Sequence, residues 1–61
     1  MLEFLDTKQV ASILRLHYKT VARMIREGRL PASKIGKEWR INRSDLEAFV
    51  ERNRRIAPQH S

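Results

Sequence analysis

The chain has 61 residues, 41% of them hydrophobic and 33% charged, with 13 lysines and arginines against 7 aspartates and glutamates. This length allows one small domain with a single core and excludes a second domain. The absence of cysteine excludes a disulfide and a thiolate zinc site, and two histidines far apart in the sequence make a poor metal pair, so we expect no metal and no cofactor. No apolar stretch approaches the ~20 residues of a membrane span, and no signal-peptide pattern is present, which predicts a cytoplasmic protein without membrane contact.

The net charge of +6 is concentrated in the middle of the sequence. Residues 1–17 and residues 44–61 each sum to zero, so the whole positive surplus falls on residues 18–43. A surplus confined to one segment is typical of a surface that faces phosphate groups. The alternative is solvated charge that serves solubility alone.

The first predicted helix covers residues 7–15. Asp6 and Gln9 have the spacing of a capping box, and the apolar residues that follow recur at helical intervals. The apolar pair Phe4 and Leu5 precedes this helix, and we expect both side chains to pack on it as a hydrophobic staple.

The second predicted helix covers residues 18–27. A turn at residues 15–17 separates it from the first helix, because the two apolar periodicities do not share a phase. We expect His17 to be the N-cap. Gly28 supplies the left-handed position that ends the helix, and Pro31 prevents its continuation.

A hairpin and a third helix complete the predicted fold. Two β-prone runs, 32–35 and 38–41, are joined by Gly-Lys at 36–37, which suits a type II′ turn. Asn42 then has the position of an N-cap before an amphipathic helix over residues 43–54. The predicted fold class is therefore mainly α with a small β-hairpin.

On a helical wheel of the second helix, Lys19, Arg23 and Arg26 fall within an arc of about 60°. The nearly opposite side of the same wheel holds Val21, Met24 and Ile25. A helix with one anchored apolar side and one basic ridge has the shape that the DNA major groove admits. An ordinary solvated surface is the alternative, but the ridge lacks the acidic i,i+4 partners that such a surface usually has.

The predicted hairpin is also basic, and it contains the only tryptophan of the chain. Lys34, Lys37 and Arg40 are expected to reach phosphates or the adjacent minor groove as a wing, which positions a protein without reading sequence. Trp39 has two alternative roles, stacking on an unpaired base or anchoring the core. A single aromatic residue in so small a chain favours the core, next to Leu30 and Phe49.

Residues 4–51 resemble the excisionase-family winged helix-turn-helix domains, which are similar to the DNA-binding module of MerR-type regulators. The most specific matching runs are EGRLP at 27–31 and GKEWRI at 36–41. The resemblance implies a winged helix-turn-helix of three helices and a two-stranded wing, with the second helix in the major groove and the wing along the backbone. We expect this domain to span residues 1–55, followed by a disordered tail at 56–61.

The resemblance also implies which residues contact DNA. Carried over by position, these are Tyr18, Lys19, Thr20, Arg23 and Arg26 in the helix and Lys34, Lys37 and Arg40 in the wing. Arg40 could equally brace the hairpin beside the tryptophan. Arg15 and His17 stand where the family often has Gly and Ser, which leaves the cap geometry at this turn open.

The function implied is double-stranded DNA binding by a small excisionase-like protein, a nucleoid-associated recombination directionality factor whose partners are a recombinase or further copies of itself on adjacent sites. The alternative in the same class is a small MerR-like transcriptional regulator, although the heptad pattern of a dimerisation helix stops after Val50. A module that docks an acidic protein is a second class, which salt dependence separates from DNA binding. No nucleophile, base and oxyanion donor converge, so we expect neither an enzyme nor a small-molecule substrate. RNA is disfavoured because A-form helices hide their major groove.

Overall fold

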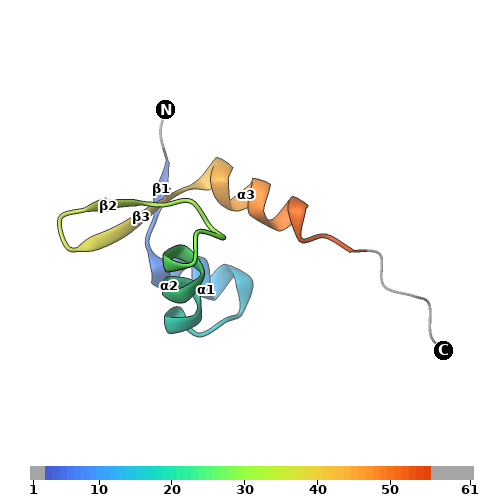
Figure 1. The fold of residues 1–61 in the computed structure, drawn as a ribbon, viewed down its shortest axis with the longest axis horizontal. Helices are drawn as coiled ribbons and strands as arrows, with labels where there is room; N and C mark the ends of the chain where they lie inside the picture. The colour runs from blue at the N-terminus through green and yellow to red at the C-terminus, as the bar shows by residue number, and fades with distance from the viewer. Residues whose placement is uncertain (1–2, 56–61) are drawn as a thin grey trace.

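The computed structural model describes residues 3–55. Three helices and a three-stranded antiparallel sheet form one small domain (Figure 1). In chain order the elements are β1 (Phe4–Leu5), α1 (Thr7–Leu14), α2 (Tyr18–Arg26), β2 (Ser33–Ile35), β3 (Glu38–Asn42) and α3 (Arg43–Arg52). The tail expected to be disordered, 56–61, lies outside the described residues.

Helix α1 begins at the predicted capping box and ends one residue earlier than predicted. The Asp6 carboxylate accepts a hydrogen bond from the Gln9 backbone N–H at 2.7 Å, and the Gln9 side chain accepts one from the Asp6 N–H at 2.9 Å. Arg15 has φ +57°, a left-handed conformation that a helix cannot continue. The Leu16 N–H then reaches back to the Ala11 carbonyl at 2.9 Å, which closes the helix end without a glycine.

Helix α2 begins at Tyr18, and His17 is its N-cap as predicted, because the imidazole Nδ1 accepts a hydrogen bond from the Lys19 N–H at 3.1 Å. It ends at Arg26, one residue short of the expected boundary. Gly28 has φ +77°, and the Arg29 N–H donates to the Met24 carbonyl at 2.9 Å, which is the bonding of a Schellman motif. The capped helix is therefore held at both ends by local hydrogen bonds.

The sheet has strand order β1-β3-β2, one strand more than the predicted two-stranded wing. Strands β2 and β3 form the expected hairpin, and φ is positive at Gly36 but not at Lys37, as a type II′ turn requires. The additional strand is β1, in which Leu5 pairs with Ile41. Two residues are too few to show the alternation by which a strand is recognised in sequence, so the pairing depends on the position of β3.

Strand β1 also corrects the predicted hydrophobic staple. Leu5 is buried in the core, whereas Phe4 is 41% exposed. Successive side chains of a strand point to opposite faces, so only one of the pair can pack on the helix side of the sheet. The other lies on the outer face.

Helix α3 starts from its predicted cap, with the Asn42 side chain accepting from the Ser44 N–H at 2.9 Å. It ends at Arg52, two residues before the predicted boundary. The side-chain amide of Asn53 donates a hydrogen bond to the Phe49 carbonyl at 2.7 Å. A side chain therefore satisfies one of the backbone carbonyls at the C-terminal end of the helix.

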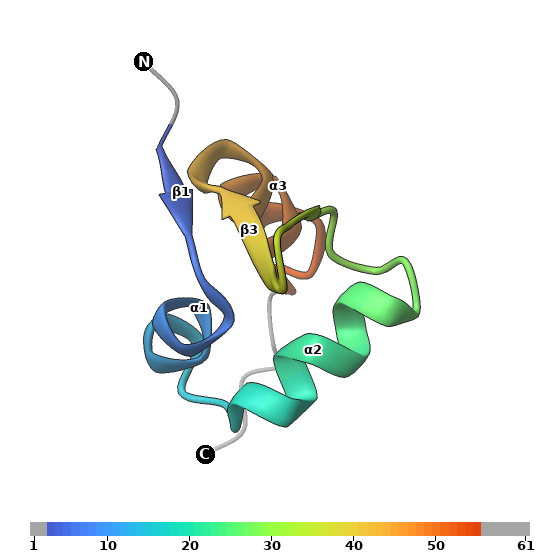
Figure 2. The same cartoon turned by 90° about the vertical axis from the view of Figure 1, so that its left-hand side faces the viewer.

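The core lies between the sheet and the helices, with α1 and α2 below the strands and α3 behind them in Figure 2. Its buried side chains are Leu5, Val10, Ala11, Val21, Met24, Ile25, Leu30, Ile41, Leu46 and Phe49. Trp39 is half-buried and packs against this cluster. The predicted contact with the core is therefore present, but the indole is less buried than the term core anchor implies. Strand β2 buries no residue and projects from the helices with β3 (Figure 1).

Candidate nucleic-acid interface

Helix α2 presents its cations away from the core. Val21, Met24 and Ile25 are buried, as the helical wheel predicts. The other side of the helix exposes Lys19, Arg23 and Arg26. Because the apolar side is fixed in the core and both ends are capped, these cationic side chains project from a rigid element.

The other two predicted contact residues of α2 lie at its first turn. Tyr18 is 43% exposed, and its ring stacks on that of His17 with centroids 4.8 Å apart. Thr20 is half-buried. Tyr18 is therefore an accessible part of this surface, whereas Thr20 lies at its border with the protein interior.

Ion pairs within residues 3–55 divide the positive charge of the middle segment into two groups. The pairs of this segment join Arg29 to Glu27 (3.7 Å), Arg40 to Glu38 (3.5 Å) and Arg43 to Glu3 (2.8 Å). In the part of the chain that the structure describes, no carboxylate forms an ion pair with the remaining cations of the segment, which are Lys19, Arg23, Arg26, Lys34 and Lys37. All five belong to α2 or the hairpin and are among the predicted contact residues.

The hairpin divides its cations between the two faces of the sheet. Lys34 pairs with Trp39 across the strands, so both lie on the face that Ile41 buries, and the Lys34 ammonium stands 5.1 Å from the indole centroid. Arg40 lies on the opposite face, where its guanidinium pairs with Glu38. The structure thus separates Arg40 from Lys34, and Lys37 is at the turn between the two strands.

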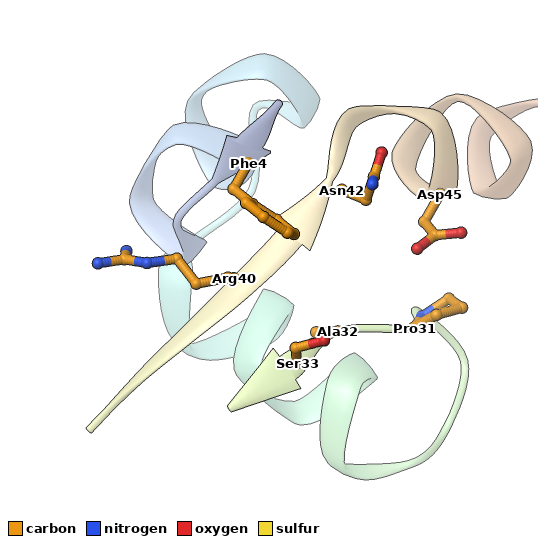
Figure 3. Close-up of a pocket in the computed structure, with 7 residues that line it drawn as sticks. All are labelled: Phe4, Pro31, Ala32, Ser33, Arg40, Asn42 and Asp45. Carbon is orange, nitrogen blue, oxygen red and sulfur yellow. The ribbon is translucent and has the colours of Figure 1, made fainter. Parts of the chain in front are cut away.

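A shallow pocket of about 270 Å³ lies on the outer face of the sheet (Figure 3). Its lining residues are Phe4, Pro31, Ala32, Ser33, Arg40, Asn42 and Asp45. Its lining includes one cationic residue, Arg40, and one anionic residue, Asp45, and the Arg40 guanidinium points away from Asp45 in Figure 3, so the pocket gives no argument for a charged ligand. No group of three or more metal-binding side chains is present among the described residues.

Lys8 is not among the contact residues predicted from the sequence, although it lies beside α2 in the structure. The Lys8 ammonium stands 5.7 Å from the centroid of the Tyr18 ring. The net charge of residues 1–17 is zero because Glu3 and Asp6 offset Lys8 and Arg15, so a charge sum over this segment does not indicate a basic surface at Lys8. Contact between α1 and α2 is a tertiary feature, and no local sequence signal indicates it.

The arrangement is that of a helix-turn-helix with a hairpin wing: two capped helices joined by a short turn, followed by a hairpin that projects from the core. The family model described as Helix-turn-helix domain matches residues 4–54. The chain belongs to this family, which includes excisionase-like proteins and is one of DNA-binding domains, typically without enzymatic activity. Comparisons with curated proteins and with solved structures give no match. Among residues 3–55, no helix has the length and apolar character needed to cross a membrane.

Proposed function

We propose that the chain is an excisionase-like recombination directionality factor that binds double-stranded DNA, with α2 in the major groove and the hairpin on the backbone or in the adjacent minor groove. The observation that carries this proposal is the face of α2 that holds Lys19, Arg23 and Arg26, exposed and without ion pairs among the described residues. The major groove is wide enough for an α-helix, and arginine can donate two hydrogen bonds to one guanine edge. The resemblance of residues 27–31 and 36–41 to excisionases supports the finer assignment.

The proposed contacts have different roles. Arg23 and Arg26 read base edges from the middle and end of α2, because their planar guanidinium groups suit two-bond recognition of guanine. The lysines contact phosphates: Lys19 from α2, and Lys34 and Lys37 from the hairpin. The side chains of Tyr18 and Thr20, in the first turn of α2, also contact phosphates. Arg40 is assigned mainly to bracing the hairpin, since it lies on the outer face and pairs with Glu38.

A single module of this size buries roughly 600–1,000 Å² on DNA, which limits the specificity of one copy. We therefore propose that neighbouring copies on adjacent sites, or a recombinase bound beside them, complete the recognition. Because DNA is the proposed partner, we propose that the chain acts inside the cell, at the nucleoid.

Titration of the chain with random duplexes over a range of salt concentrations tests the DNA-binding proposal. Neutralisation of four to six phosphates predicts a log–log slope of affinity against salt of about −3.6 to −5.4. A module for an acidic protein would instead bind duplex DNA weakly and with a shallow slope. Failure to bind any duplex would contradict the proposal.

Selection of preferred duplexes from a random pool, followed by footprinting, separates the two DNA-dependent roles. Repeated half-sites beside a recombination attachment site would support the directionality factor. One inverted repeat over a promoter would instead support a small MerR-like transcriptional regulator that uses the same face of α2.

A further inference from the structure

Lys8 and Tyr18 form a contact between two helices at the start of α2. Lys8 is exposed in the first turn of α1, and its ammonium stands 5.7 Å from the centroid of the Tyr18 ring. The same ring stacks on His17 at 4.8 Å with an interplanar angle of 25°. The ring is therefore held by a neighbour in its own chain segment, and it in turn restricts the positions that the Lys8 side chain adopts.

The two acidic residues nearest to Lys8 in sequence are engaged elsewhere. Glu3 Oε1 accepts a hydrogen bond from Arg43 Nε at 2.8 Å, which ties it to the start of α3. Asp6 caps α1 through the Gln9 backbone at 2.7 Å. Within residues 3–55, no ion pair involves Lys8, so its charge adds to the basic surface of α2.

We propose that Lys8 and Tyr18 form a binding site for a backbone phosphate at the N-terminal end of α2. This inference rests on the proposed function, because the phosphate belongs to the duplex whose major groove α2 enters. The Lys8 ammonium lies over the Tyr18 ring, 5.7 Å from its centroid, and an ammonium and a phenol hydroxyl can each donate a hydrogen bond to a phosphodiester group. The contact comes from α1, so it fixes the position of α2 along the groove independently of the base-reading arginines.

The test is a salt titration of Lys8→Ala and wild type on random and on selected duplexes, with Arg55→Ala as the matched control. Arg55 is exposed and follows α3, which runs away from α1 and α2 (Figure 1). Loss of one phosphate contact should make the log–log salt slope of Lys8→Ala shallower by about 0.9 on every duplex. The ratio of wild-type to variant affinity should then fall about threefold between roughly 50 and 200 mM salt, because the wild type releases one counterion more.

The role of Tyr18 is tested by repeating Lys8→Ala in a Tyr18→Leu background. Without the ring to hold the lysine, the loss caused by Lys8→Ala should be smaller than in the wild type. Equal losses in the two backgrounds would overturn the part assigned to Tyr18. Should Tyr18→Leu fail to fold, the slope of Lys8→Ala alone decides the phosphate contact, since Lys8 is exposed and outside the core.

The failures of the two proposals are distinguishable. Suppose that the wild type binds duplex DNA with a steep salt slope, and that Lys8→Ala has the same slope and affinity as Arg55→Ala. The phosphate site is then overturned, whereas DNA binding by α2 is not contradicted. If the wild type binds no duplex, both proposals are wrong. The midpoint temperature of thermal unfolding is measured for each variant. A midpoint equal to that of the wild type shows that a difference in affinity arises in binding and not in folding.

Discussion

Helix α2 and the β2–β3 hairpin have comparable numbers of cations but arrange them differently. In α2 the spacing of four and three residues places Lys19, Arg23 and Arg26 on one face, opposite the buried side. In the hairpin the alternation of strands sends Lys34 to the face of Trp39 and Arg40 to the other. Helical periodicity therefore gathers charge into one ridge, whereas strand periodicity divides it, and only the ridge has the form of a reading surface.

The double substitution Arg23→Ala with Arg26→Ala should give the largest effect on DNA binding. Each arginine that donates two hydrogen bonds to a guanine favours that base over the others by about 1–3 kcal/mol. Affinity for a selected duplex should therefore fall steeply, and affinity for random duplexes should fall less. Mobility-shift titration of both duplex types measures this difference. Unchanged affinity for the selected duplex would refute the placement of α2 in the groove. Arg55→Ala measures the effect of removing one exposed positive charge outside this face.

Trp39→Ala should mainly affect stability, because the indole packs against the core from the hairpin. Truncation of a fully buried Trp costs about 3–5 kcal/mol, and a half-buried one should cost roughly 2 kcal/mol. Urea unfolding monitored by circular dichroism gives the value. A variant that unfolds as the wild type does but loses DNA binding would show that Trp39 stacks on a base instead.

Lys37→Ala removes the cation at the turn of the hairpin. It should weaken binding to all duplexes alike and make the salt slope shallower by about 1, as expected for a phosphate contact without sequence preference. Salt titrations on two unrelated duplexes measure both quantities. Loss confined to one of the duplexes would mean that the wing reads sequence, which would remove the contrast with α2.

Arg40→Ala should have the smallest effect on DNA affinity, within about twofold, because its guanidinium lies on the outer face and pairs with Glu38 at 3.5 Å. An exposed pair of this kind contributes about 0–1 kcal/mol, so stability should also change little. A loss as large as that of Lys37→Ala would place the outer face in contact with DNA. The same mobility-shift and unfolding assays measure both outcomes.

Local patterns predicted most of the fold correctly. The capping box of Asp6, the His17 and Asn42 caps and the glycine after α2 are short-range features, and each forms the expected hydrogen bond or backbone angle. Helix ends were less exact, since Arg15 ends α1 by adopting φ +57°, a conformation unusual for a residue with a side chain.

The features that sequence reasoning missed join residues far apart in the chain. Strand β1 exists through its pairing of Leu5 with Ile41, and the ion pair of Glu3 with Arg43 neutralises a cation that the charge sum had assigned to the basic segment. Lys8 joins that surface only because α1 packs beside Tyr18.

The order of amino acids alone determined the helices, their caps, the hairpin and the basic ridge of α2, because each depends on periodicity and hydrogen bonds within a few residues. Tertiary structure decided which cations of residues 3–55 form ion pairs and which elements present the other cations together. Pairing of charges depends on distance in space, and folding brings Glu3 to Arg43 and Lys8 to Tyr18 across separations that no local pattern records.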